Sequence, residues 1–355
     1  MKLKIIPLIG LMLLILSGCA EKKAVVIQKS KGLPVMKLES TLPETSFISN
    51  NIPGENSVIT SPKSIGIIKS PQQKESTSKT EIKSTVTNSI QSNQSPSTQL
   101  ISQPLTIIPG EVLVYQLKWN FLNVGKIIFA CKEDTIDSQK IYHIMAITLP
   151  QGIWTRFGYG YNRFDSYIDA ATNLPYYFYD YSASASRAEI INSKIDQNKG
   201  IISTTIKKEI LKNNSIYSDV KKTTRFKGII YDSLSAFYVL RSENMWDKNF
   251  FVIPVGTIKT CNLYMYVLGQ KTQKFPGFGE KKYFDTFAQT NYNEGIFRKG
   301  KLYMGITANK SRIPLFLKGS VPLGTGYVNL IERLSLGNNF PTNSEYLTNI
   351  LNSSS

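Results

Sequence analysis

The chain has few of the residues that build most catalytic and metal sites. Its 355 residues include one histidine and three cysteines. A metal site made of several imidazoles is therefore excluded, and a serine–histidine–acid triad would have to use His143. No glycine-rich phosphate loop, nucleophile elbow or paired-cysteine metal motif occurs in the sequence. We expect no metal, no cofactor and no catalytic residue.

His143 itself lies in an alternating apolar run, residues 141–149, on the same strand face as Ile141 and Met145. This placement predicts a hydrogen-bonded core histidine. Asp165 and Asp169 could form a pair of catalytic acids on one strand face, but four residues of strand span about 13 Å, which is wider than glycosidases use. We expect acids at turns and strand ends, and no enzymatic activity.

Long hydrophobic runs are also missing, apart from residues 5–16, which are too few for the roughly 20 that span a bilayer. Lys2 and Lys4 precede this run, and Leu16-Ser17-Gly18-Cys19 ends it, which predicts a cleaved signal peptide over residues 1–18. The last four residues resemble the lipobox of bacterial lipoproteins. The resemblance implies that Cys19 receives a diacylglycerol and becomes the N-terminus, and that several acyl chains hold the protein on the membrane.

One alternative remains at this cysteine. An ordinary signal peptide could end beside Cys19 by chance. If the protein is a lipoprotein of a host with two membranes, Ala20 after the cysteine points to the outer membrane.

Acidic residues are scarce, since 25 Asp and Glu stand against 42 Lys and Arg, a net charge of +17. Residues 105–340 hold 30 Lys and Arg and 18 Asp and Glu, so +12 of the excess lies there. An exported protein rarely meets nucleic acid, and we expect none as a partner. Anionic lipid or an acidic glycan is the expected ligand, and a solvated basic face without a ligand is the alternative.

Composition divides the rest of the chain into three parts. Residues 19–104 are rich in Ser, Thr, Lys, Gln and Asn, with too little apolar surface to fold, and we predict a disordered linker. Residues 105–336 alternate in polarity and are rich in Val, Ile, Tyr and Phe, which predicts a β-rich domain. Residues 337–355 turn polar again and are predicted to be a flexible tail.

The expected fold is all-β, a mostly antiparallel curled or barrel-like sheet around one central helix. Asp232 can cap that helix, and Leu234, Phe237, Tyr238 and Arg241 recur at helical spacing. We expect the helix to pack on the concave side of the sheet. The predicted strands are 111–119, 126–132, 141–149, 159–169, 175–181, 201–211, 216–226, 250–255, 258–268, 284–290, 301–307, 314–318 and 327–334.

Two further features suggest sites. Cys131 and Cys261 lie in predicted strands. They could form a disulfide in an oxidising compartment, or they could remain two buried thiols. Aromatic residues are dense between 154 and 181. They could line a groove for a lipid tail or a sugar ring, or they could simply be core. The candidate groove and rim residues are Trp154, Arg156, Phe157, Arg163, Tyr176, Phe178 and Arg187.

Short motifs in order along residues 105–335 resemble the domain-of-unknown-function 3108 family. They are Pro109-Gly110-Glu111 with Tyr115, Trp119 and Gly125; Phe164-Asp165-Ser166-Tyr167-Ile168-Asp169 leading to Leu174-Pro175; the helix over 232–241; Gly295-Ile296-Phe297; Lys301-Leu302-Tyr303; Arg312-Ile313-Pro314; and Gly324. Ala308-Asn309 departs from the acidic residues expected there, so any binding by those acids is not implied here. The resemblance implies an exported, often lipid-anchored β-rich domain with no assigned activity and no catalytic residues.

Three functions fit these observations. The first is a non-enzymatic outer-membrane lipoprotein that binds or carries an amphiphilic component of the cell envelope. The second is an assembly or scaffolding lipoprotein that binds another envelope protein. The third, which we rank last, is a hydrolase that uses scattered acids. An apolar cavity would favour the first, a filled interior with an exposed apolar patch the second, and converging acids in a cleft the third.

Overall fold

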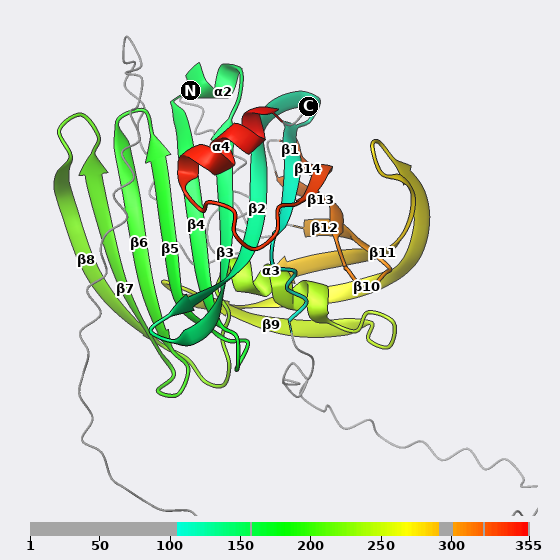
Figure 1. The fold of residues 1–355 in the computed structure, drawn as a ribbon, viewed down its shortest axis with the longest axis horizontal. Coiled ribbons are helices and arrows are strands. Elements are labelled where there is room, and N and C mark those ends of the chain that lie inside the picture. The colour runs from blue at the N-terminus through cyan, green and yellow to red at the C-terminus, as the bar shows by residue number, and fades with distance from the viewer. Residues whose placement is uncertain (1–104, 157, 291–300, 322–323, 354–355) are drawn as a thin grey trace, which may run out of the picture. The chain divides into compact units, whose positions relative to one another are not determined.

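A computed structural model describes residues 105–156, 158–290, 301–321 and 324–353. The signal peptide, Cys19 and the linker of our prediction lie outside these residues. The described chain forms one antiparallel sheet of 14 strands in the order β8-β7-β6-β5-β4-β3-β2-β1-β14-β13-β12-β11-β10-β9 (Figure 1). The predicted class, a mostly antiparallel curled sheet with few helices, is confirmed.

The strands are β1 Glu111–Trp119, β2 Leu122–Ile136, β3 Gln139–Pro150, β4 Tyr159–Asp169, β5 Pro175–Ser184, β6 Arg187–Asp196, β7 Ile201–Ile210, β8 Ser215–Arg225, β9 Phe250–Gly256, β10 Thr260–Phe275, β11 Gly279–Thr290, β12 Lys301–Thr307, β13 Pro314–Val321 and β14 Gly324–Ser335. The prediction omitted β6. Its apolar residues Ile190 and Ile191 are adjacent, and polar residues surround them, so the alternation that marks the other strands is weak there.

The order of the strands divides the sheet into two runs of consecutive hairpins. The runs β1 to β8 and β9 to β14 meet where β1 pairs with β14, from Glu111 opposite Ser335 to Trp119 opposite Gly326. Strands β8 and β9 follow each other in the chain but lie at opposite edges of the sheet. The segment that joins them contains α3 (Ser233–Ser242).

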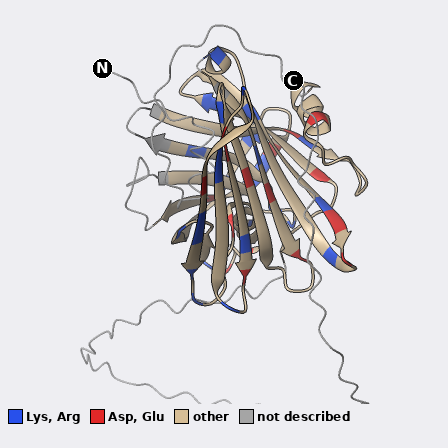
Figure 2. Ribbon diagram, turned by 90° about the vertical axis from the view of Figure 1, so that its left-hand side faces the viewer, with Lys and Arg blue, Asp and Glu red and all other residues tan. Residues whose placement is uncertain are grey.

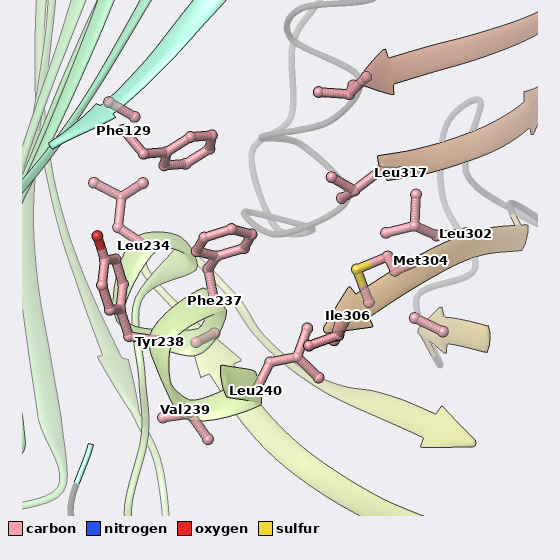
Figure 3. Close-up of a cluster of buried hydrophobic side chains, with 14 of the residues drawn as sticks. Phe129, Leu234, Phe237, Tyr238, Val239, Leu240, Leu302, Met304, Ile306 and Leu317 are labelled. Atoms are coloured by element: carbon pink, nitrogen blue, oxygen red, sulfur yellow. The ribbon is translucent and has the colours of Figure 1, made fainter. Parts of the chain in front are cut away.

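Helix α3 confirms the predicted central helix. The Asp232 carboxylate caps it by accepting from the backbone N–H groups of Leu234 and Ser235, as proposed from the sequence. Residues of α3 contact the neighbouring strands β3 and β4 and also β9, which lies at the far edge in the strand order, so the sheet curls around the helix. In the core that results, the ring of Phe237 stacks on that of Phe129 from β2, with centroids 4.8 Å apart (Figure 3).

The curl brings the two edges of the sheet close together. The turn between β9 and β10 accepts hydrogen bonds from the opposite edge: Thr204 Oγ1 donates to the Thr257 carbonyl at 3.2 Å, and Thr224 Oγ1 donates to the Ile258 carbonyl at 2.7 Å. In a closed barrel, backbone hydrogen bonds would join these two edges, whereas here the two bonds come from side chains.

The outer face of the sheet carries a second helix, which corrects the predicted flexible tail. Residues 344–353 form α4 (Ser344–Ser353), and Leu347 and Leu351 are fully buried against Val112, Ile128 and Met145 of β1 to β3. Leu347, Ile350 and Leu351 have the spacing of one helix face, so burial of that face orders a segment that its polar composition suggested was frayed. Within the described part of the chain, no helix has the length and apolarity needed to cross a membrane.

Candidate binding surface

Three charged or titratable side chains form a buried cluster on the outer face of β3 and β4, beside α4. Arg163 donates to both carboxylate oxygens of Asp165, from Nε and Nη2, each at 2.7 Å. His143 Nε2 lies 2.8 Å from Asp165 Oδ1. Asp165 is 3 % exposed and Arg163 is 8 % exposed. The bidentate pair lies within β4, and the contact between His143 and Asp165 links β3 to β4.

The Asp165 carboxylate remains ionised in spite of its burial. Desolvation alone would raise its pKa, but the hydrogen bonds from His143 and Arg163, together with the Arg163 charge, outweigh it and lower the pKa of Asp165 to about 2. The cluster therefore contains a buried negative charge that the Arg163 guanidinium neutralises.

The cluster does not have the geometry of a nucleophilic triad. The nearby hydroxyl, Ser344 Oγ of α4, accepts from Arg163 Nη1 at 3.0 Å and from the Tyr161 hydroxyl at 2.6 Å. It thus contacts the guanidinium and not the imidazole that would have to activate it. What these bonds do is attach the first turn of α4 to β4.

Tyrosine rings surround this cluster on the same face. Tyr167 stacks on His143 with ring centroids 4.3 Å apart, and it meets Tyr177 edge-on at 5.6 Å. The Tyr177 hydroxyl donates to Asn192 Oδ1 of β6 at 2.6 Å. Because Asp165 pairs with Tyr179 across the strands, that tyrosine faces outward as well.

We call this group the tyrosine surface. Its members are partly buried phenols of β4 and β5 on the outer face of the sheet: Tyr161, Tyr167, Tyr176, Tyr177, Tyr179 and Tyr181.

These phenols are neutral at ordinary pH, and burial raises their pKa values further. Desolvation raises the pKa of Tyr161 and of Tyr176 to about 12. The surface therefore offers flat, apolar rings whose hydroxyl groups can both donate and accept.

The residues proposed for a groove are divided between the two faces of the sheet. Trp154 and Phe178 belong to the inner core around α3. Arg163 and Tyr176 lie on the outer face. Regular alternation would place Tyr176 and Phe178, two residues apart on β5, on one face. The pairing of β5 with β4 shifts its register here, so Tyr176 is an extra residue of the strand and its ring lies beside Tyr167 on the outer face.

The remaining candidates do not join them. Arg156 is exposed at the end of α2 (Ile153–Arg156). Arg187, at the start of β6, lies over the ring of Tyr217 at 5.5 Å from its centroid. Phe157 lies outside the described residues. The structure thus places tyrosines on the outer face of β4 and β5 and does not bring the proposed groove residues together on one face.

The two cysteines of the domain are buried thiols, and the structure does not join them by a disulfide. Burial raises the pKa of Cys131. The sequence allowed either a disulfide or two buried thiols, and the structure has two buried thiols.

The cluster of Asp165, Arg163 and His143 was not predicted. We considered Asp165 together with Asp169 and expected both at turns or strand ends. Asp169 fits that expectation, since it accepts the backbone N–H groups of Ala171 and Thr172 in the turn after β4. The sequence did contain one sign of the cluster: Arg163 and Asp165 are two residues apart on a predicted strand, so their side chains lie on the same face. The contribution of His143 could be seen only once the pairing of β4 with β3 was known.

The fold and this surface define a class of protein: a curled antiparallel sheet wrapped around one buried helix, with a tyrosine-rich outer face. Among the residues the structure describes, no group of three or more His, Cys, Asp or Glu could hold a metal ion. The family model "Protein of unknown function (DUF3108)" matches residues 114–331, and the chain belongs to this family. The match runs from β1 into β14 and confirms the resemblance seen in the short motifs.

Comparison with other proteins adds little to this. No curated protein sequence matches the chain. Among solved structures, a β-barrel-like protein of the domain of unknown function DUF1849 from Brucella abortus aligns with a TM-score of 0.41 and 9 % identity. The alignment covers 64 % of this chain and 98 % of that one.

Proposed function

We propose that the protein is a non-enzymatic lipoprotein of the cell envelope that binds another envelope protein through the tyrosine surface. This is the assembly or scaffolding function considered from the sequence. The observation that carries it is the group of outward-facing, partly buried tyrosines held over the Arg163–Asp165 pair.

The chemistry of that surface suits a protein partner. Tyrosine and arginine are enriched at protein interfaces, and a tyrosine side chain loses little conformational entropy when it is covered. Here the rings are already restrained, Tyr167 by His143 and Tyr177 by Asn192, so binding would order few additional groups.

The packing of the interior also supports protein binding over carriage of an amphiphile inside the sheet. Helix α3 occupies the concave side, and Leu234, Phe237 and Leu240 of α3 are at most 1 % exposed. Figure 3 shows these side chains filling the space between β2 and β12.

One observation favours the amphiphile as a second candidate. On the inner face, Ile191, Ile206 and Val220 form one cross-strand row from β6 to β8. Ile191 is 3 % exposed and Val220 is 50 % exposed, so the apolar inner face extends beyond the core. A lipid tail could lie along this row.

Photo-cross-linking in intact cells separates the two candidates. A photoreactive amino acid replaces Tyr179, and the matched control replaces Tyr303, a partly buried tyrosine of β12. A protein adduct of one defined mass at 179, absent at 303, is the expected result. A lipid adduct at Val220 without a protein adduct at 179 would favour the carrier, and no adduct at 179 would contradict protein binding there.

The membrane anchor has its own test. Cys19→Ser should release the protein from the membrane fraction, because the acyl chains could no longer be attached. If the variant still sediments with membranes, the lipobox interpretation is wrong.

A further inference from the structure

The hairpin between β1 and β2 ends in an unusually exposed apolar tip. Phe121 is 86 % exposed and Leu122 is 45 % exposed. The turn is not loose: the backbone N–H of Asn120 donates to the Thr325 carbonyl at 2.7 Å, and the Thr325 N–H donates to Asn120 Oδ1 at 3.0 Å. These bonds fix the turn to the start of β14, so Phe121 stays in solvent on a rigid support.

Two lysines and a tyrosine lie on the strands next to this tip. Lys118 of β1 and Lys318 of β13 both pair with Tyr327 of β14, from its two sides, so the three side chains share one face. Lys318 Nζ lies 5.7 Å from the centroid of the Tyr327 ring. Next to the exposed tip, the amphipathic ring of Tyr327 thus lies between the positive charges of Lys118 and Lys318.

The described turns and strand ends around this tip carry charge of one sign. Residues 116–128, 146–156, 158–162, 318–321 and 324–329 contain no Asp or Glu. Their cations are Lys118, Lys126, Arg156 and Lys318, of which Lys126 donates to the Leu351 carbonyl. On other strands, Lys, Arg, Asp and Glu are interspersed (Figure 2). This end of the sheet is therefore complementary to an anionic surface.

We propose that this end of the sheet docks on an anionic lipid bilayer. Phe121 and Leu122 enter the interfacial layer, Tyr327 lies at the level of the head groups, and Lys118 and Lys318 face lipid phosphates. Interfacial binding combines buried apolar area with attraction to anionic lipid, and aromatic rings prefer the membrane–water boundary. The inference does not depend on the tyrosine surface.

Vesicle sedimentation tests this docking without the acyl chains. The chain from residue 19 onward, with Cys19→Ser, is mixed with vesicles of phosphatidylcholine alone or of phosphatidylcholine with phosphatidylglycerol. We expect binding to the mixed vesicles only, weakened by salt. The Phe121→Ser/Leu122→Ser and Lys118→Ser/Lys318→Ser variants should each bind about tenfold more weakly or worse.

The matched control is Ile216→Ser/Tyr217→Ser on β8, where the two residues are 51 % and 50 % exposed. It should bind like the parent. Phe121→Trp should also bind, and brominated lipid should quench the fluorescence of the indole that this substitution adds. The proposal is overturned if the parent does not bind the mixed vesicles, or if the β8 variant loses as much binding as Phe121→Ser/Leu122→Ser. It is also overturned if the brominated lipid does not quench the added indole. Thermal melts show that each variant is folded.

Discussion

Replacing Asp165 with asparagine removes the carboxylate that neutralises Arg163 in the buried cluster of the outer face. Removing one partner of a buried ion pair costs roughly 3–5 kcal/mol, because the other charge stays buried. The pKa of Asp165, about 2 against the ordinary 3.8, corresponds to about 2 kcal/mol of net stabilisation of the ionised carboxylate, after the cost of desolvation. We therefore expect Asp165→Asn to lower the free energy of unfolding by roughly 2–5 kcal/mol.

The pH dependence of this loss has a definite sign. A carboxyl group whose pKa is lower in the folded chain adds stability above its unfolded pKa, and this stability disappears as the pH falls through the folded pKa. For Asp165 the window runs from about 4 down to about 2. Wild-type protein should lose about 2 kcal/mol more than Asp165→Asn across it, because the variant has no carboxyl group to protonate.

Urea unfolding followed by tryptophan fluorescence, repeated from neutral pH into this window, measures both effects. Asp196→Asn is the matched control, because Asp196 pairs with Lys199 at 3.3 Å with its side chain 41 % exposed, so a much smaller change is expected. Equal midpoints for Asp165→Asn and Asp196→Asn, or parallel pH profiles for wild type and Asp165→Asn, would refute the account of the cluster.

Three further predictions concern a buried ion pair and the packing of side chains, and urea midpoints measure each. Arg241→Met should cost roughly 3–5 kcal/mol, because Arg241 is fully buried with Nη1 2.7 Å from Glu111; Arg333→Met, at the 38 % exposed partner of the same glutamate, should cost below about 1 kcal/mol, and equal losses would contradict this. Gly305→Ala should cost roughly 1–3 kcal/mol, because the added Cβ would lie 2.2 Å from the Phe316 ring. Phe316→Leu should reduce the cost of the Gly305 change, and additive effects would argue against the clash. Leu347→Ala should cost roughly 2–5 kcal/mol and speed amide exchange in α4; unchanged exchange would mean that α4 does not depend on this contact.

Local patterns in the sequence were enough to predict most of the secondary structure. Alternating polarity identified nearly all the strands, because a strand with one face in the core must repeat every two residues. The α3 helix was equally readable, since Asp232 caps it and its apolar residues recur at helical spacing. Strand β6 was missed because its alternation is weak, and α4 because its polar residues hid one apolar face.

The candidate surface was predicted less well than the fold. The density of tyrosines between 154 and 181 drew attention to the right strands, but the groove prediction combined residues of both faces. Trp154 and Phe178 entered the core, while Tyr176 and Arg163 faced outward. Tyr176 and Phe178 have the same parity, and the shift in register that separates them arises from the pairing of β5 with β4, which the sequence of β5 alone does not specify.

By itself the sequence determined the class of fold, the place of the buried helix and the lack of residues for a multi-histidine metal site, because each depends on composition or on short-range periodicity. The tertiary structure alone decided which strands meet. The pairing of β1 with β14 joins Glu111 to Ser335, and the pairing of β3 with β4 brings His143 to Asp165. Register is a property of the packed sheet, so the pattern within a single strand could not specify these contacts.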